Sequence, residues 1–197
     1  MRRLLLMRHA RTDAVHGVAF PLDESLDAAG LRAAGELAGR LGRGDAFCSP
    51  SRRARETAAA AGLDAEVVPA LGECDFGAWA GRTLAQVDAQ DAHGTRAWMT
   101  DPDARPHGGE TLGELLERVG GWLDEQAQLR GRAIAITHGG VVKAAVVHAL
   151  AAPPVAFWRV DVAPLAATEL HAHDGRWTLA RVNAPVVAAS ERARAMA

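Results

Sequence analysis

The sequence contains few cysteines, a single lysine and no long hydrophobic run. Cys48 and Cys74 are too few for a disulfide framework, and this scarcity is typical of proteins in a reducing compartment. The apolar run at residues 4–7 is too short for a secretory signal, and neither it nor residues 144–152 reaches the length of a membrane span. We therefore expect a cytoplasmic protein without a membrane partner. The presence of only one lysine, Lys143, carries no functional weight by itself.

Basic blocks are also absent, and the net charge of −2 gives no reason to expect a nucleic-acid partner. A chain of 197 residues is long enough for one well-buried domain, whereas two independent domains would be cramped. Hydrophobic residues make up 49% of the chain and charged residues 23%, as in ordinary soluble globular proteins.

Strand-like and helix-like segments alternate along the chain. The expected strands are residues 2–7, 46–48, 66–68, 132–137, 168–173 and 177–182. The expected helices are residues 27–41, 51–61, 111–129 and 140–151. This order predicts an α/β fold, a three-layer α/β/α sandwich with a mostly parallel central sheet.

The domain organisation expected from this pattern is simple. Residues 1–184 form a single domain, and residues 185–197 form a tail that is either a short helix or unstructured. Residues 82–108 are rich in loop-forming residues, so we expect an irregular lid over the site that sets substrate choice.

Two histidines each follow a hydrophobic strand. Arg8 and His9 close the strand at residues 2–7, and His138 closes the strand at residues 132–137. A lone strand-end histidine is more often a hydrogen-bonded core residue than a catalyst. However, ligands of open α/β sheets bind outside the carboxyl ends of the strands, so two such histidines suggest one shared pocket.

A third feature is the arginine-rich start of the expected helix at residues 51–61. Helix N-termini favour anions, and the planar fork of an arginine such as Arg53 matches the geometry of a phosphate. The plainer alternative is a solvated helix face in which Arg52, Arg53 and Arg55 have Glu56 as their partner. Together with Arg8 and the two histidines, the pattern predicts a site where two arginines hold a phosphoryl group.

Five motifs in order make the chain similar to the histidine phosphatase superfamily, which includes the cofactor-dependent phosphoglycerate mutases. They are residues 6–12 (LMRHART), 49–58 (SPSRRARETA), 71–81 (LGECDFGAWAG), 106–111 (PHGGET) and 137–141 (THGGV). The resemblance extends from about residue 3 to residue 150 and implies a phosphoglycerate mutase-like fold.

The resemblance also implies a covalent mechanism. His9 attacks phosphorus and forms a phosphohistidine, as a neutral imidazole can near pH 7. Glu73 protonates the leaving alkoxide and then deprotonates the attacking water. This role requires a raised pKa, which we expect from the neighbouring Phe76 and Trp79.

The other implied roles concern the phosphoryl oxygens. Arg8, Arg53 and a protonated His138 hold them, and Thr12 and the backbone amide of Gly139 complete the substrate-binding set. A side chain at Gly139 is expected to crowd the phosphate. With this many cationic groups, the resemblance implies no metal and no cofactor.

Departures from the family pattern favour hydrolysis over the alternative of a phosphoglycerate mutase. Val15 stands where relatives often carry an asparagine that contacts phosphate, and His16 is the only basic residue nearby. The insertion of the mutases is also missing. The stretch at residues 157–159 resembles alpha-ribazole phosphatases, so the expected substrate is a small phosphorylated metabolite, with alpha-ribazole 5′-phosphate or broad specificity as the finer expectation.

Two alternatives of other classes remain open. One is a metal hydrolase, because His171, His173, Asp101 and Asp103 are residue types that bind metals. The other is a phospho-ligand-binding module without catalysis. The carboxyl-terminal strands offer an edge for a homodimer.

Overall fold

The computed structural model of the chain describes residues 1–13 and 19–186. At its centre lies a six-stranded sheet. In spatial order the strands are β3 (Glu66–Val67), β2 (Asp45–Cys48), β4 (Gly131–Thr137), β1 (Arg2–Arg8), β5 (Ala167–His173) and β6 (Arg176–Ala184). The first four strands run parallel to one another, and β5 runs antiparallel to both of its neighbours, β1 and β6. The predicted mostly parallel sheet is therefore confirmed.

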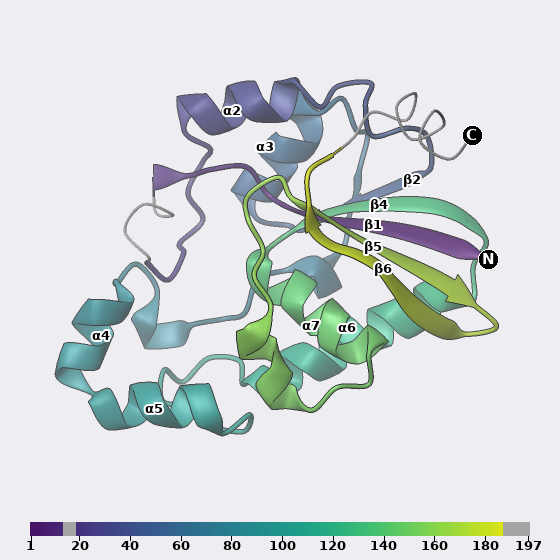
Figure 1. Cartoon of the computed structure of the whole chain (residues 1–197). Helices are drawn as coiled ribbons and strands as arrows, with labels where there is room; N and C mark the ends of the chain where they lie inside the picture. The colour runs from purple at the N-terminus through teal and green to yellow at the C-terminus, as the bar shows by residue number, and fades with distance from the viewer. Residues whose placement is uncertain (14–18, 187–197) are drawn as a thin grey trace.

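Helices cover both faces of this sheet, which confirms the predicted α/β/α sandwich (Figure 1). The four covering helices are α2 (Ala28–Gly35), α3 (Arg52–Ala60), α6 (Leu112–Ala127) and α7 (Gly139–Ala149). Successive side chains of a strand point to opposite faces. Accordingly, Leu4 and Leu6 of β1 belong to the core under α6 and α7, and Leu5 and Met7 to the core under α2 and α3. Apolar residues on both faces make β1 a continuous hydrophobic run.

One expected helix is shorter than the sequence pattern suggested. The spacing of apolar residues favoured a helix over 27–41, but α2 ends at Gly35 and hydrogen-bonded turns follow. Gly39 adopts a φ of 75°, which takes the backbone out of the α-helical region. Leu37 and Leu41 are nevertheless buried, so the pattern located the core side chains correctly.

Two local features fix where elements begin and turn. The hydroxyl of Thr111 accepts a hydrogen bond from the Glu114 N–H at 3.1 Å, and the Glu114 carboxylate accepts one from the Thr111 N–H at 2.8 Å. This reciprocal capping starts α6. Asp174 and Gly175, with φ values of 49° and 73°, form the tight turn between β5 and β6.

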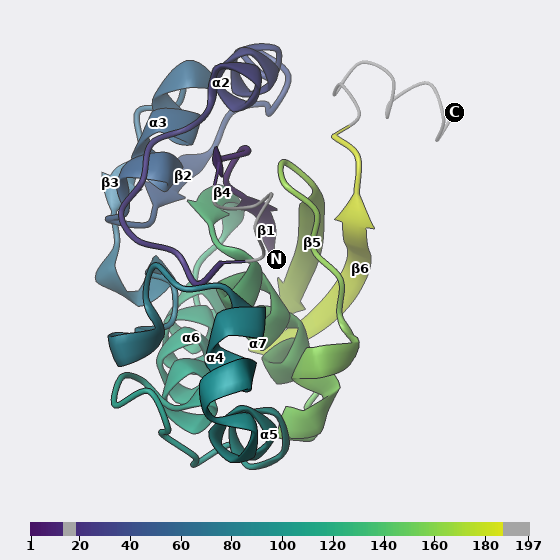
Figure 2. The same ribbon diagram turned by 90° about the vertical axis from the view of Figure 1, so that its left-hand side faces the viewer.

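The lid region is helical, so the prediction of an irregular segment over 82–108 was wrong. It contains α4 (Leu84–Gln90) and α5 (Ala92–Thr100), both set to one side of the sheet (Figures 1 and 2). Thr83 and Gln86 cap α4 reciprocally, and the Asp91 carboxylate caps α5 by accepting from the Gly94 N–H. These caps and tertiary packing stabilise two helices of only seven and nine residues, which are marginal on their own.

The described residues also form three short 3₁₀ turns: η1 (Pro69–Leu71), η2 (Gly77–Trp79) and η3 (Pro154–Arg159).

Aromatic contacts hold the lid in place. Phe20, Trp79 and Val87 form a separate buried cluster beneath α4 and α5. Trp98 of α5 contacts Trp158 of η3, with ring centroids 4.6 Å apart. The lid therefore rests on a small core of its own.

No helix among residues 1–13 and 19–186 is both long and apolar enough to cross a membrane. Val15, His16 and residues 187–197 of the expected tail lie outside the described residues. The assignment of residues 1–184 to one domain stays a prediction.

Candidate active site

The carboxyl ends of β1 and β4 meet at one pocket. These strands are neighbours, with Arg8 paired to Thr137, so the residues that follow them, His9 and His138, lie side by side. Their ring centroids are 5.2 Å apart, and both side chains are buried. The expectation that the two strand-end histidines share a site agrees with this geometry.

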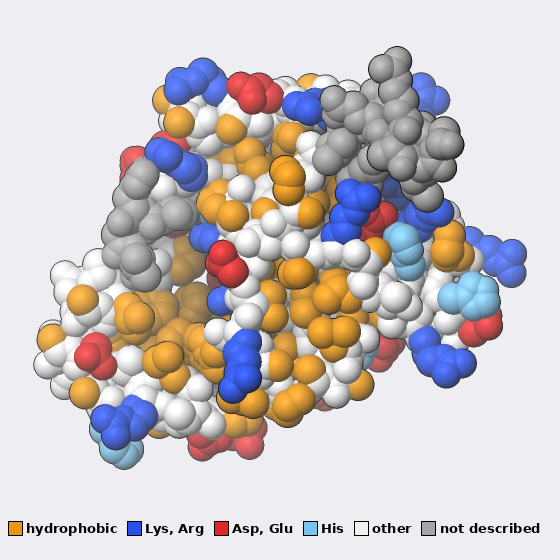
Figure 3. Space-filling view, viewed as in Figure 1, with side chains coloured by type: hydrophobic (Ala, Val, Ile, Leu, Met, Phe, Trp, Pro, Cys, Tyr) orange, Lys and Arg blue, Asp and Glu red, His pale blue; other side chains and the backbone are white. Residues whose placement is uncertain are grey.

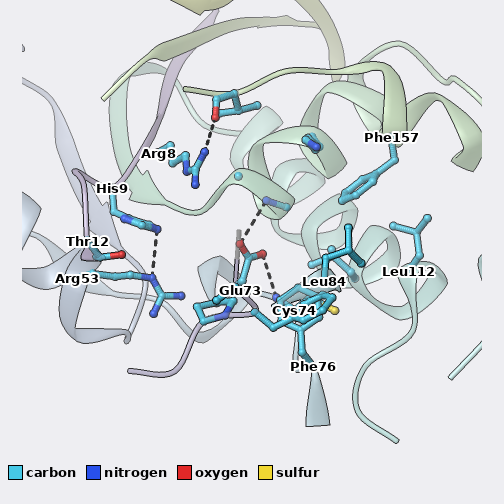
Figure 4. Close-up of a pocket in the computed structure, with 18 of the residues that line it drawn as sticks. Arg8, His9, Thr12, Arg53, Glu73, Cys74, Phe76, Leu84, Leu112 and Phe157 are labelled. Carbon is cyan, nitrogen blue, oxygen red and sulfur yellow. Dashed lines mark hydrogen bonds between the residues drawn. The ribbon is translucent and has the colours of Figure 1, made fainter. Parts of the chain in front are cut away.

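Arg53, in the first turn of α3, joins these two imidazoles. Its Nε donates to His9 Nε2 at 3.2 Å (Figure 4). Its Nη2 donates to His138 Nδ1 at 3.1 Å. Its Nη1 donates to the Leu22 carbonyl at 2.7 Å, and the Glu24 carboxylate lies 3.8 Å away. Only 2% of Arg53 is exposed, so the guanidinium is fixed inside the site.

Hydrogen bonding defines the tautomer of His9. Its Nδ1 lies 2.7 Å from the Ala10 carbonyl, which can only accept, so Nδ1 carries the hydrogen. Nε2 then holds a lone pair and faces the guanidinium of Arg53. Burial, with Arg53 and Arg8 acting in the same direction, lowers the pKa of His9 to about 3. The ring is therefore neutral and nucleophilic at all physiological pH values.

The surroundings of His138 disfavour the protonated ring that was expected. Burial and the charge of Arg53 lower the pKa of His138 well below its ordinary value. Nδ1 accepts from Arg53, and Nε2 lies 2.7 Å from the hydroxyl of Ser49, to which it donates. The sequence showed the histidine but not this enclosure, because the cation and the hydroxyl come from another part of the chain.

Arg8 projects from the end of β1 into the same pocket. Its Nη1 donates to the Val162 carbonyl at 2.7 Å. Its Nε is buried and has no hydrogen-bond partner among the described residues. Thr12 also lines the pocket and is buried, with its hydroxyl 3.4 Å from the Glu24 carboxylate. Arg8 therefore offers a free charged donor to an anion.

Glu73 lies across the pocket from His9, and Figure 4 shows its carboxylate directed into the space between them. It accepts from the N–H groups of Cys74 at 3.1 Å and Gly140 at 3.4 Å. Burial raises the pKa of Glu73, although these bonds and the charge of Arg53 act in the opposite direction. The raised pKa agrees with the expectation for a general acid.

The expected cause of the raised pKa is only half correct. Phe76 lines the pocket with Glu73, but Trp79 does not, because Trp79 packs in the lid cluster. Two glycines lie close to these charged groups. A Cβ on Gly139 would lie 3.7 Å from Arg8 Nε, an ordinary contact, whereas a Cβ on Gly140 would lie 2.3 Å from Glu73 Oε1. Of the two, it is therefore Gly140 at which a side chain would displace the Glu73 carboxylate, and the crowding of phosphate by a side chain at Gly139 stays a prediction.

The remaining walls of the pocket are mostly apolar, and its volume is about 440 Å³. The space-filling view shows this hollow, with hydrophobic side chains over its floor, beside the lid helices (Figure 3). The apolar side chains include Phe20, Phe76, Leu84, Trp98, Leu112, Phe157 and Trp158. Leu84 and Trp98 belong to the expected lid, while the lid histidines His93 and His107 do not line the pocket.

Sequence reasoning missed several charged residues of this pocket. Glu24 and Asp161 come from irregular segments without a motif, so no signal pointed to them. Lys143 was noted only as the single lysine, although its spacing of four residues from Gly139 puts it on the same side of α7. Ser49 stood in a motif directly after a strand, which was a usable signal for a site residue.

The residues of the metal-hydrolase alternative are spread over the surface. His171 pairs with Glu169 and His173 with Asp174, both in the β5–β6 hairpin region, whereas Asp101 follows α5. In the part of the chain that the structure describes, no group of three or more His, Cys, Asp or Glu side chains is placed to hold a metal ion. The alternative therefore gains no support from these residues.

Comparison with known proteins agrees with this geometry. The family model of the histidine phosphatase superfamily (branch 1) matches residues 4–185. The chain belongs to this superfamily. Among the relatives, a glucosyl-3-phosphoglycerate phosphatase of Mycobacterium tuberculosis is 34% identical over 177 residues, which cover 80% of this chain and 78% of that protein. This member of the superfamily thus has a phosphatase relative that matches most of its length.

A bifunctional protein of Mycobacterium tuberculosis is 38% identical over 127 residues, and the match spans only 35% of that protein's length. Two solved structures align almost completely with this histidine phosphatase. Mycobacterial glucosyl-3-phosphoglycerate phosphatase with VO3 has a TM-score of 0.81 and 31% identity, covering 93% and 100% of the two chains. An alpha-ribazole phosphatase from Shigella flexneri has a TM-score of 0.81 and 25% identity, covering 94% and 98%.

Proposed function

We propose that this histidine phosphatase hydrolyses a small phosphomonoester without a metal, through a phosphohistidine on His9. The observation that carries the proposal is the environment of His9: a buried, neutral ring whose Nε2 lone pair faces the Arg53 guanidinium. In the first step Nε2 attacks phosphorus, the new N–P bond forms, and the P–O bond to the alcohol breaks. In the second step water attacks phosphorus and releases inorganic phosphate and free His9.

Cationic donors stabilise the charge on the phosphoryl oxygens in both steps. Arg53 is fixed between the two imidazoles, and Arg8 holds an unpaired buried Nε toward the same space. Thr12 and the Gly139 amide line this end of the pocket. We propose that His138 stays neutral until a phosphoryl dianion binds, because the added negative charge favours its protonation.

Glu73 acts on the leaving oxygen. Its raised pKa favours the protonated carboxyl group, whose proton is transferred to the departing alkoxide as the P–O bond breaks. The resulting carboxylate accepts a proton from the water that attacks the phosphohistidine. The N–H groups of Cys74 and Gly140 orient Glu73 for both transfers.

We propose hydrolysis rather than mutase activity, and a metabolite with a compact alcohol portion as the substrate. The named relatives are phosphatases of glucosyl-3-phosphoglycerate and alpha-ribazole phosphate, and the curated glucosyl-3-phosphoglycerate phosphatase has the higher identity, 34% against 25%. Glucosyl-3-phosphoglycerate is therefore a candidate beside the alpha-ribazole 5′-phosphate expected from the sequence. A cytoplasmic location and a homodimer are further proposals, which cell fractionation and light scattering would test.

The test is a phosphate-release screen of sugar, nucleotide, glycerate and ribazole phosphates, with product analysis by NMR. We expect inorganic phosphate and free alcohol, and competitive inhibition by vanadate. Transfer of phosphate between two carbons of one substrate would instead establish a mutase. Tight phosphate binding without turnover of any ester would establish a binding module.

A further inference from the structure

Lys143, the only lysine of the chain, lines the pocket but has no part in the mechanism above. It lies in α7, one turn after Gly139, which belongs to the phosphoryl end of the site. Its Nζ lies 5.4 Å from the ring centroid of Phe157, within the range of a cation–π contact. Among the described residues it forms no ion pair. The ammonium group thus has an aromatic face beside it but no anionic partner.

The two carboxylates near Lys143 accept hydrogen bonds from other groups. Asp161 accepts from the Val162 N–H at 2.9 Å and from the Asn183 amide at 3.3 Å, and Glu73 accepts from the N–H groups of Cys74 and Gly140. Burial lowers the pKa of Lys143, while the charges of Asp161 and Glu73 raise it. A half-buried cation without a close anion is costly unless a ligand supplies the missing charge.

Lys143 lies at the end of the pocket where the alcohol portion of the substrate is expected. Figure 4 shows Glu73 between His9 and Arg53 on one side and Phe157 on the other. If phosphorus binds at His9 and the leaving oxygen at Glu73, as in the proposed function, the alcohol extends past Glu73 toward Phe157. Lys143 lies beside that ring. This inference therefore rests on the proposed function.

We propose that Lys143 is a specificity-determining residue that binds a carboxylate on the alcohol portion of the substrate. The substrate class is then a phosphomonoester of a small hydroxy acid, or of a larger alcohol that carries a carboxylate. A singly charged carboxylate balances one ammonium group, whereas a second phosphate dianion exceeds that charge and would be repelled more strongly by Asp161. A neutral hydroxyl would leave the charge of Lys143 uncompensated.

The experiment compares 3-phosphoglycerate with glycerol 3-phosphate, which share a three-carbon skeleton and differ in the carboxylate. We expect the wild-type kcat/KM to be about tenfold or more higher for 3-phosphoglycerate, as for a charge-assisted hydrogen bond. Lys143→Met should remove this preference, mainly through KM, and should leave turnover of p-nitrophenyl phosphate within about twofold of wild type. Lys143→Arg should keep part of the preference.

Arg96→Met is the matched control, because Arg96 is an exposed cation of α5 that does not line the pocket. It removes the same charge and should leave the preference unchanged. If Lys143→Met does not fold, acetylation of the folded wild-type protein removes the charge from its only lysine side chain.

Three results would overturn the assignment of Lys143: no wild-type preference, an equal loss for both substrates in Lys143→Met, or the same loss in Arg96→Met. Absence of p-nitrophenyl phosphate turnover by the wild type would overturn the proposed function itself. The two failures are therefore distinguishable.

Discussion

The two ends of the pocket are built differently. The phosphoryl end is formed by Arg8 and His9 at the end of β1 and by Arg53 from the helix that follows β2, with the fully buried His138 beside them at the end of β4. His9, Arg53 and His138 are buried, and Arg53 hydrogen-bonds to both imidazoles. The lid end is formed mainly by aromatic side chains from short helices and turns, in contact through ring edges rather than hydrogen bonds.

This difference separates chemistry from selection. A parallel sheet covered on both faces fixes the residues at its carboxyl ends, so the phosphoryl end is pre-organised. The lid helices α4 and α5 pack on the small aromatic cluster around Trp79 and contribute none of the proposed catalytic residues. Changes at the phosphoryl end should therefore affect all substrates, and changes at the lid end should affect some substrates more than others.

The largest effect should come from His9→Ala, which removes the nucleophile. We expect kcat to fall at least about a thousandfold for every phosphomonoester, since no other group can form the N–P bond. Phosphate-release assays measure this loss, and circular dichroism checks that the fold is retained. Substantial residual activity with a native spectrum would contradict the role of His9.

Glu73→Gln should distinguish substrates by their leaving groups. We expect kcat to fall about 10²- to 10⁴-fold for alkyl phosphates, because an alkoxide needs protonation as it departs. The loss for p-nitrophenyl phosphate should be much smaller, since p-nitrophenolate is a good leaving group. Equal losses for the two classes would show that Glu73 does not act as the acid.

Gly140→Ala should show the same dependence on the leaving group as Glu73→Gln, with a smaller loss of kcat. The new Cβ would lie 2.3 Å from Glu73 Oε1 and displace the carboxylate, so alkyl phosphates should lose about tenfold in kcat. Gly139→Ala is the matched comparison, because its Cβ meets Arg8 only at 3.7 Å. We expect it to affect alkyl and p-nitrophenyl phosphates alike, and a leaving-group dependence in Gly139→Ala would argue against this assignment.

Trp98→Ala tests the lid end. Loss of its contacts with Phe20 and Trp158 should raise KM for bulky phosphomonoesters about fivefold. The inhibition constant of vanadate should stay unchanged, because vanadate occupies only the phosphoryl end. A parallel change in both constants would mean that the two ends are not independent.

The pH dependence of stability offers a further test. Because the pKa of His9 is about 3 in the folded protein and about 6.5 when unfolded, the unfolded chain binds more protons between these values. The free energy of unfolding should therefore decrease as pH falls from about 6.5 toward 3. His9→Ala should reduce the decrease between pH 7 and 4 by about 1–3 kcal/mol, measured by urea unfolding. Trp98→Ala should leave the slope unchanged, and an unaltered slope in His9→Ala would contradict the burial argument.

Much of the phosphoryl end could be predicted from sequence, because it depends on local patterns. Arg8, His9 and His138 each follow a clear hydrophobic strand, and neighbouring parallel strands bring their ends together. Arg53 stood at a recognisable helix start. Glu73, in contrast, follows no strand and was found through the resemblance alone.

The lid and the protonation states depend on tertiary contacts that no local pattern contains. The helices α4 and α5 are too short to be stable alone, and they form on the aromatic cluster around Trp79. The lowered pKa of His138 follows from its burial and from the charge of Arg53. The role proposed for Lys143 depends on the packing that places α7 beside the pocket, which no local pattern contains.

The stereochemical course at phosphorus tests the central claim most directly. A substrate with an isotopically labelled, chiral thiophosphate group would be hydrolysed in labelled water, and the configuration of the released thiophosphate determined. Attack by His9 followed by attack of water inverts phosphorus twice, so the account predicts net retention. Net inversion would show direct attack by water on the ester and would contradict the phosphohistidine mechanism.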